Sequence, residues 1–403
     1  MKDLNQLILI LKKGIDKNSN YIKTIRDPHL LIKSLKELNN SIGNRKIKTS
    51  ISMQVSHLIM NKLRSQRHHD EEHVMLNVLL CGDPGVGKTM IGTIVAKIWY
   101  SLGYLKGAAI KPKSTFVELT EDNSQWQFFL FIILIWVIAL TWQFYNSYGG
   151  LFTFLLVITI IAIAAALWYK MPQTVPHVEY EMKEEEIIRI VSRSNLVAGY
   201  VGQTAPKTRK VLEECLGKVL FVDESYSLCQ SPEDSFGAEC VNEINLFLSQ
   251  HPDEIIVIFA GYKDLIEASI FATQPGLKRR FMWQFDCEGY DSKELFDIFQ
   301  LKVDKQHLKL KEKEEIKSLF NQHHHLMKNY GGDCEKILFY SKLEHSNDYM
   351  ESPEIYDIDT LETEHVNRGF DTFMENTLFK DEKTGNPMVN FMNMFREKSL
   401  QRN

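Results

Sequence analysis

The chain has 403 residues, of which 44% are hydrophobic and 25% charged, which is average for a folded protein and leaves room for an α/β core with a second, smaller domain. The net charge is -5 and the Lys and Arg residues are scattered, so nucleic acid is not expected as a partner. The six cysteines show no C-x-x-C pair or other metal spacing, and most lie inside apolar runs, so we expect a reduced, cytosol-facing body.

The amino-terminal third is expected to be helical at first and to continue into an α/β fold. The first 70 residues have a helical pattern that is interrupted at Asp27-Pro28. Residues 75–81 form a short apolar run that ends at a glycine, and a helical stretch follows over residues 88–102. This strand–glycine–helix order is the beginning of a βαβ series.

Two apolar segments follow, at residues 126–144 and 151–169, each 19 residues long and without a charge. As helices they would span roughly 28 Å, and aromatic residues stand at their ends, so they predict a transmembrane hairpin within an insert at residues 107–186. Flanking lysines place both termini and the remaining domain in the cytosol, which predicts a multi-pass (two-helix) membrane protein with the lipid bilayer as a partner. The alternative is a buried hydrophobic hairpin inside a large core.

Further strand and helix signals alternate after the insert. Residues 187–191, 219–222 and 255–260 are apolar runs of the buried parallel-strand type, and Pro206 and Gly217 bracket a helix. After about residue 286 amphipathic helices take over. The fold class is therefore α/β with a parallel sheet, followed by a helical domain.

The most informative local pattern lies between the first strand and its helix. The eight residues match G-x-x-x-x-G-K-[ST] and are Gly82, Asp83, Pro84, Gly85, Val86, Gly87, Lys88 and Thr89. Such a loop turns its backbone N–H groups toward phosphate, while the lysine reaches the β- and γ-phosphates and the threonine hydroxyl binds Mg²⁺. The alternative, an ordinary glycine-rich turn, does not explain the strand before it. ATP and Mg²⁺ are the predicted cofactors.

A second chemical signal is the acidic pair at the end of the strand at residues 219–222. Asp223 would lie beside the Mg²⁺ shell, and Glu224 would orient and deprotonate the attacking water. Many strands end in a polar turn, so the pair alone is weak evidence. Together with the phosphate loop it predicts an ATP hydrolase.

These motifs, with NLVAGYVGQTAPKTRKVL (195–212), VIFAGYKDLI (257–266) and QPGLKRRF (274–281), resemble the AAA+ ATPases of the CbbX/SpoVK type, which include rubisco-activase-like remodellers. The resemblance implies that Tyr200, Val201 and Gly202 form a loop that grips a polypeptide in the pore of a ring. It also implies that Arg280, or its neighbour Arg279, reaches the γ-phosphate bound to an adjacent subunit. The alternatives are a strand-to-helix turn with a packed tyrosine and a basic surface turn.

The chain departs from the wider family at two sensor positions. Ala260-Gly261-Tyr262 stands where many AAA+ proteins have a sensor asparagine, a replacement shared with the CbbX-like branch. The second sensor arginine is missing, both after Tyr330-Gly331-Gly332-Asp333 and at Gly385-Asn386-Pro387-Met388. Neighbouring histidines at residues 68–73 and 323–325 cannot all face one ion from a regular helix, and we expect them to be exposed and without function.

The predicted domains are a helical N-terminal region (1–38), an AAA+ α/β ATPase domain (39–288) interrupted by the insert, and a helical lid (289–403). The predicted function is a membrane-anchored ATPase that remodels or extracts a protein substrate of unknown identity as a homo-oligomeric ring, expected to be a hexamer. The alternative is a nucleotide-regulated membrane scaffold that binds ATP with little hydrolysis.

Overall fold

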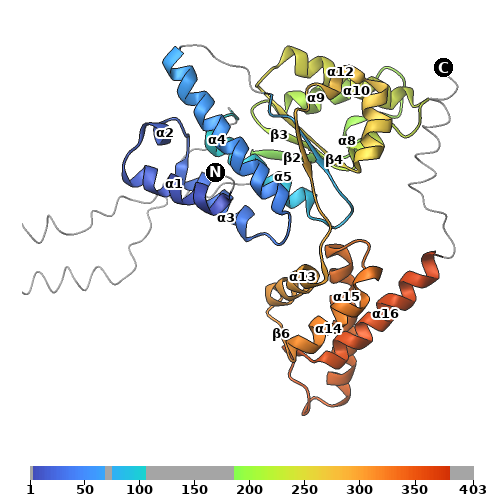
Figure 1. Ribbon diagram of the computed structural model, residues 1–403. Coiled ribbons are helices and arrows are strands. Elements are labelled where there is room, and N and C mark those ends of the chain that lie inside the picture. Colours follow the sequence, from blue (N-terminus) through green and yellow to red (C-terminus); the bar gives the residue numbers. More distant parts are fainter. Residues whose placement is uncertain (1–2, 69–74, 106–185, 382–403) are drawn as a thin grey trace, which may run out of the picture. The chain divides into compact units, whose positions relative to one another are not determined.

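The computed structural model describes residues 3–68, 75–105 and 186–381 of the chain (Figure 1). Five parallel strands form the central sheet in the spatial order β2-β3-β4-β1-β5. Their bounds are β1 (Val78–Cys81), β2 (Ile188–Val191), β3 (Val219–Val222), β4 (Ile256–Gly261) and β5 (Trp283–Asp286). Because all five strands run the same way, the loops that follow them meet at one edge of the sheet, which is where α/β proteins bind ligands.

Helices cover both faces of the sheet, since strands buried on two sides need apolar partners on each. On one face Leu220 and Phe259 belong to a buried cluster with Ile244 of α10. On the other face α5 lies so close that a Cβ on Gly92 would overlap the ring of Phe221. The helices between the strands are α5 (Lys88–Leu102), α8 (Arg193–Leu196), α9 (Thr204–Glu213), the 3₁₀ turn η2 (Ser225–Leu228), α10 (Ser235–Gln250), α11 (Lys263–Ile266), the π-helical turn η3 (Glu267–Phe271) and α12 (Pro275–Lys278).

Four helices precede the sheet: α1 (Leu4–Asp16), α2 (Asn20–Lys23), α3 (Pro28–Asn40) and α4 (Arg45–His68). The predicted break at Asp27-Pro28 is confirmed, because Asp27 caps α3 by accepting the Leu30 N–H at 2.9 Å and Pro28 is its first residue. Helix α3 packs against α5, which brings the end of α3 close to the loop between β1 and α5.

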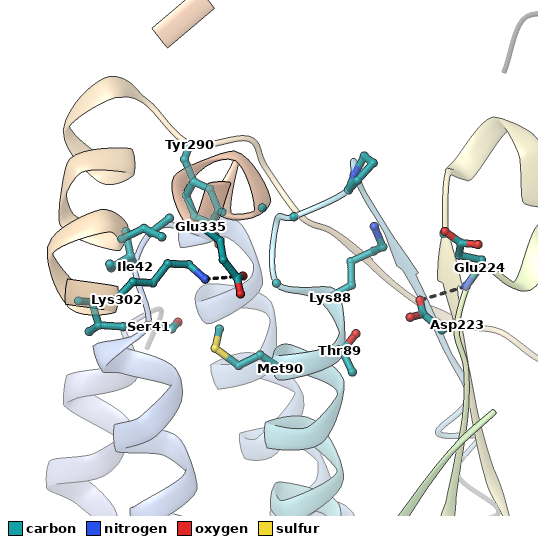
Figure 2. Close-up of a pocket in the computed structure, with 18 of the residues that line it drawn as sticks. Ser41, Ile42, Lys88, Thr89, Met90, Asp223, Glu224, Tyr290, Lys302 and Glu335 are labelled. Atoms are coloured by element: carbon teal, nitrogen blue, oxygen red, sulfur yellow. Dashed lines mark hydrogen bonds and ion pairs between the residues drawn. The ribbon is translucent and has the colours of Figure 1, made fainter. Parts of the chain in front are cut away.

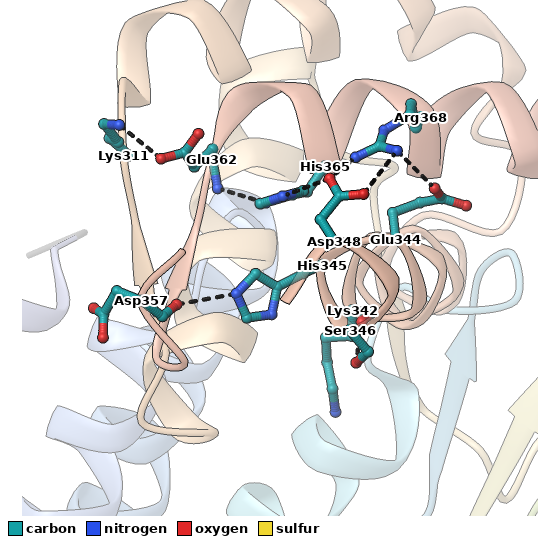
Figure 3. A network of polar contacts seen from close by, with 10 residues as sticks. All are labelled: Lys311, Lys342, Glu344, His345, Ser346, Asp348, Asp357, Glu362, His365 and Arg368. Atoms are coloured by element: carbon teal, nitrogen blue, oxygen red, sulfur yellow. Dashed lines mark hydrogen bonds and ion pairs between the residues drawn. The ribbon is translucent and has the colours of Figure 1, made fainter. Parts of the chain in front are cut away.

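A helical domain, here named the lid, follows β5. It consists of α13 (Ser292–Lys305), α14 (Lys313–His323), the 3₁₀ turn η4 (His324–Leu326), α15 (Gly331–Glu351) and α16 (Thr363–Asp381), with a two-stranded parallel ladder of β6 (Lys309–Leu310) and β7 (Thr360–Leu361). Phe299, Phe320 and Phe370 are fully buried in its core, where the Phe320 ring is tilted against Phe299 and meets Phe370 edge-on. A polar network joins α15 to α16, with Arg368 bonded to Asp348 and Glu344 (Figure 3).

The sequence correctly predicted four strands and the helix at residues 88–102, with boundaries shifted by three residues at most. It missed β5, because this edge strand has one polar face and therefore lacks a continuous apolar run. Trp283 is partly exposed, Gln284 is exposed and Phe285 is buried. The helix expected to start at Pro206 begins at Thr204, whose hydroxyl accepts the Ala198 N–H.

The predicted membrane localisation requires correction. None of the helices within residues 3–68, 75–105 and 186–381 is long and apolar enough to cross a bilayer. The long ones, α4, α15 and α16, carry charged side chains along their length, whereas a spanning helix needs about 20 mostly apolar residues. The predicted transmembrane helices, at 126–144 and 151–169, lie outside the described residues, as does the predicted sensor motif at 385–388.

Candidate nucleotide site

The loop between β1 and α5 has the backbone of a phosphate-binding loop. Gly82, Gly85 and Gly87 have φ of 154°, 75° and 82°, a region that L-residues rarely adopt. Val86, between the last two glycines, is fully buried and anchors the loop to the domain. The glycines of the motif are therefore needed for the path of the backbone, which leads directly into the N-terminus of α5, where the helix dipole favours an anion.

Lys88 is the first residue of α5, and its side chain folds back over the loop. Its Nζ donates to the carbonyl oxygens of Gly82 at 2.9 Å and Asp83 at 2.7 Å. Burial lowers the pKa of Lys88, while the carboxylates of Asp223 and Glu224 act against that shift. The ammonium group thus lies between the loop and the acidic pair, in position to accept phosphate oxygens as its partners.

The acidic pair follows β3 and faces α5 across the pocket (Figure 2). Asp223 accepts the Glu224 N–H through Oδ1 at 3.0 Å. Glu224 itself has φ 45° and ψ 46°, a left-handed conformation that is rare and strained for a residue with a Cβ. Thr89 and Asp223, the two predicted Mg²⁺ ligands, line the same cavity as Glu224.

Two tyrosines stand beside the acidic pair. Tyr226 follows Glu224 in η2, Tyr262 follows β4, and their ring centroids are 5.8 Å apart. Burial, with the nearby charge of Glu224, raises the pKa of Tyr226 to about 12, and burial also raises that of Tyr262. Both phenols stay protonated at neutral pH, so they can act as hydrogen-bond donors next to Glu224. Sequence analysis noted Tyr262 but not Tyr226, which has no motif of its own.

The pocket has a volume of about 570 Å³, within the range of small-molecule sites. The N-terminal region, the sheet edge and the lid all contribute to its walls. Its lining comprises Asn40, Ser41 and Ile42 after α3; Pro84, Gly85, Gly87, Lys88, Thr89 and Met90; Asp223, Glu224, Tyr226, Gly261 and Tyr262; and Tyr290, Ile298, Leu301, Lys302, Gly331, Gly332 and Glu335. Gly331 and Gly332 belong to the segment at 330–333 that resembles the start of a nucleotide-facing helix, whereas the other lid residues and the N-terminal ones lie in no local motif.

The phosphate loop is held from outside by two contacts. The Gly331 N–H, at the start of α15, donates to the Gly85 carbonyl at 3.2 Å. The buried Tyr290 hydroxyl donates to the Val86 carbonyl at 2.9 Å and receives the Asn44 side-chain amide at 3.3 Å. Tyr290 and Asn44 were missed by sequence analysis because their positions in the chain lie 246 residues apart.

The two candidate arginines lie away from this pocket, before β5. Arg280 extends along α10, where its Nε donates to Asn245 Oδ1 at 3.1 Å and its Nη2 to Ser249 Oγ at 2.6 Å. The Arg280 carbonyl accepts from the side chain of Asn77 at 3.3 Å. Arg279 is exposed, and its side chain forms no hydrogen bond within the described residues. Neither arginine lines the pocket of its own chain.

The predicted pore-loop residues also lie outside the pocket. Tyr200 is 74% exposed and Val201 89% exposed, and Gly202 has a φ of 75°. The Tyr200 ring is therefore largely exposed and is not packed against the described residues.

Several known proteins are similar to this chain. No family model matches the chain. A cfxQ-like protein of Acanthamoeba polyphaga mimivirus is 26% identical over 366 residues, covering 90% of this chain and 68% of the relative. Protein CbbX of Cereibacter sphaeroides is 36% identical over 121 residues, covering 30% of this chain and 39% of the relative.

The chloroplastic ribulose bisphosphate carboxylase/oxygenase activase of Cyanidioschyzon merolae is 25% identical over 66% of this chain and 64% of the relative. Among solved structures, the FIGL-1 AAA domain in complex with ADP covers 45% of this chain and 60% of that chain, with 18% identity and a TM-score of 0.34. The chain is thus similar to the CfxQ and CbbX proteins, and its phosphate loop and acidic pair at one sheet edge are those of an ATP hydrolase.

Proposed function

We propose that the chain binds MgATP in the 570 Å³ pocket, hydrolyses it as a homo-oligomeric ring, and uses the energy to remodel a protein substrate. The observation that carries the proposal is the convergence of Lys88, Thr89, Asp223 and Glu224 on one cavity at the carboxyl edge of a parallel sheet.

The phosphate loop binds the triphosphate. Backbone N–H groups of the glycine-rich turn and the N-terminus of α5 receive phosphate oxygens, and Lys88 exchanges its two loop carbonyls for the β- and γ-phosphates. The hydroxyl of Thr89 and the carboxylate of Asp223 provide the hard oxygen ligands that Mg²⁺ prefers. When bound, Mg²⁺ neutralises charge on the β- and γ-phosphate oxygens.

Glu224 is the general base. Its carboxylate takes a proton from a water molecule whose oxygen forms a bond to the γ-phosphorus, while the bond from that phosphorus to the β-γ bridging oxygen breaks. The products are ADP and inorganic phosphate. The Glu224 side chain forms no bond to the Asp223 carboxylate, which accepts only the Glu224 backbone N–H among the hydrogen bonds of the described residues, so the two acids can serve different partners.

Arg280 completes the site of a neighbouring subunit. Asn245 and Ser249 hold its guanidinium on the surface of α10, which leaves other N–H groups for a phosphate. A held arginine loses less conformational freedom when it contacts the transition state than a mobile one. Arg279, whose exposed side chain has no partner in the part of the chain that the structure describes, is the second candidate for this contact.

Tyr200 and Val201 grip the substrate polypeptide. An exposed aromatic and an exposed aliphatic side chain next to each other offer apolar contact to polypeptides of many sequences, which suits a remodelling enzyme of low sequence specificity. Gly202 gives the loop the left-handed turn that presents them.

The Glu224→Gln variant tests the enzymatic part of this proposal. Since general-base catalysis contributes about 10²–10⁴-fold, turnover of ATP should fall by at least about 100-fold, while ATP affinity measured by calorimetry stays within about twofold. Glu213→Gln, an exposed glutamate on α9, is the matched control and should retain full turnover. Unchanged hydrolysis in Glu224→Gln would refute the assigned role.

A further inference from the structure

An ion pair on the lid side of the pocket has no role in the phosphate chemistry described above. Lys302 of α13 and Glu335 of α15 both line the cavity, and Lys302 Nζ lies 3.0 Å from Glu335 Oε2. The side chain of Lys302 is 28% exposed and that of Glu335 is 72% exposed, so the carboxylate is open to a ligand in the cavity.

The position of Glu335 lies between the two ends of the pocket. Lys88 and Thr89 mark the phosphate end, and Figure 2 shows Glu335 between these residues and Ile42. The apolar residues Ile298 and Leu301 also line the pocket, together with Ile42, and suit a planar base. In a nucleoside triphosphate the ribose joins the base to the phosphates, so the sugar should occupy the part of the pocket that Glu335 faces.

Helix α15 fixes this position. The N–H of Gly331, its first residue, donates to the Gly85 carbonyl of the phosphate loop at 3.2 Å. Residues four apart in a helix share a face, so Glu335 points to the same side as Gly331, one turn further from the phosphates. The contact therefore sets the distance between the carboxylate and the loop.

The presence of the Glu335 carboxylate in a pocket for an anionic ligand requires a chemical explanation. Without a partner it would repel the phosphates, and the Lys302 ammonium offsets that repulsion. Ionised glutamate only accepts hydrogen bonds, and within a nucleotide the ribose hydroxyls are donors. Carboxylates recognise ribose hydroxyls in this way in dinucleotide-binding folds.

We propose that Glu335 accepts hydrogen bonds from the ribose hydroxyls of the bound nucleotide, and that Lys302 holds its carboxylate in place, so that the site selects ribonucleotides over deoxyribonucleotides. The inference rests on the proposed binding of ATP in this pocket. It assigns Glu335 a direct contact with the ligand and makes Lys302 a positioning residue.

The test measures the affinity of the full chain for ADP, 2′-deoxyADP and 3′-deoxyADP by titration calorimetry, which needs no turnover. A hydrogen bond to a charged acceptor corresponds to about tenfold or more in affinity, so at least one deoxy analogue should bind about tenfold more weakly than ADP. In Glu335→Ala the difference should shrink to about twofold. The matched control is Glu314→Ala, which removes an exposed lid carboxylate paired with Lys317 and should keep the wild-type preference.

The Lys302→Met variant separates positioning from direct phosphate contact. If Lys302 acts through Glu335, its loss should weaken the binding of adenosine and ADP by similar factors and reduce the ribose preference. A loss confined to ADP would show that Lys302 binds phosphate instead and would overturn its assigned role. Equal affinity of the wild-type chain for ADP and both analogues, or a preference that survives in Glu335→Ala, would overturn the role of Glu335. Failure of the wild-type chain to bind ADP or ATP at all would instead refute the proposed function.

Discussion

At the scale of single residues, the site contains a backbone conformation that costs free energy and is rare outside functional positions. Glu224 adopts a left-handed backbone at the end of β3, although it carries a side chain. Strain of this kind persists where the surrounding structure enforces it, and it gathers at functional positions. The backbone of this glutamate therefore supports the same role as its chemistry.

Replacing Glu224 by glycine should increase stability while abolishing hydrolysis. Glycine adopts the left-handed region without the steric cost of a Cβ, which is about 1 kcal/mol here. Denaturant unfolding of the full chain should show Glu224→Gly more stable than Glu224→Gln by about that amount. A glycine variant that is less stable than the glutamine variant would show that the backbone is not strained.

The Tyr290 hydroxyl should contribute more to the free energy of unfolding than an ordinary surface hydroxyl does. Tyr290→Phe leaves the Val86 carbonyl without its donor and the Asn44 amide without its acceptor, in a buried setting, so the free energy of unfolding should fall by about 1–3 kcal/mol. Tyr21→Phe removes an exposed hydroxyl-to-carbonyl hydrogen bond of 2.9 Å and should cost less than about 0.5 kcal/mol. Equal effects in chemical denaturation would contradict the account.

Sequence alone indicated the phosphate loop and the acidic pair because each is contiguous, and its chemistry needs particular residue types at fixed spacing. It could not indicate Tyr290, Asn44, Lys302 or Glu335. Each of these acts only through a partner that is distant in the chain, and none lies in a short motif.

At the scale of elements, alternating apolar runs and helical stretches correctly predicted the fold class. They did not give the strand order, because the placement of β1 between β4 and β5 follows from pairing across the whole sheet. The small β6–β7 ladder was also missed, since two-residue strands leave no periodicity to detect. The boundaries of the domains remain predictions.

Adding one methyl group at Gly85 should disrupt the contact between the phosphate loop and the lid. Gly85 has a φ of 75°, and a Cβ there would overlap the carbonyl oxygen of Asn329, just before α15. Gly85→Ala should therefore displace the lid, break the hydrogen bond to Gly331 and weaken ATP binding by about tenfold. Gly199→Ala, where a Cβ would meet nothing within 4 Å, should bind ATP like the wild-type chain.

The network between α15 and α16 should make the lid sensitive to acid (Figure 3). His365 is buried; its Nδ1 accepts the Glu362 N–H at 3.1 Å, and its Nε2 lies 3.2 Å from Asp348 Oδ2. Burial lowers the pKa of His365, and the neighbouring His345 and Arg368 lower it further. Below the ordinary histidine pKa of about 6.5, His365 therefore binds a proton in the unfolded chain but stays neutral in the folded lid.

Stability should consequently fall as the pH drops from about 7 to 5, before the paired Asp348 begins to titrate. The pKa of Asp348 is lowered by its hydrogen bond to Arg368, so its contribution is lost only near and below its usual pKa of about 4. Thermal unfolding between pH 7 and 5 should show a shallower slope in His365→Gln. His324→Gln, at an exposed lid position, should retain the wild-type slope, and identical slopes for both variants would exclude His365 as the source.

At the scale of the whole molecule, one pocket collects residues from the N-terminal helices, the sheet edge and the lid. Binding of a nucleotide therefore couples segments that are far apart in the chain. The arginines before β5 do not line this pocket, so under the role proposed for Arg280 the arginine of each site comes from a second copy of the chain.

Arginine action between subunits can be tested by mixing two inactive variants. Arg280→Ala should lower turnover by about 10³-fold or more, and Arg279→Ala by less. A mixture of Arg280→Ala with Glu224→Gln should recover activity, since some interfaces then combine an intact glutamate with an intact arginine. No recovery on mixing, or a larger loss in Arg279→Ala, would contradict the assignment of Arg280.

The central claim is that this chain is a ring-forming ATP hydrolase. The most direct measurement is steady-state ATP hydrolysis by the full chain over a concentration series, with Lys88→Ala and Glu224→Gln measured in parallel. The account predicts turnover per chain that rises cooperatively with protein concentration and disappears in both variants. Turnover per chain that is independent of concentration, or hydrolysis that persists in Glu224→Gln, would contradict it.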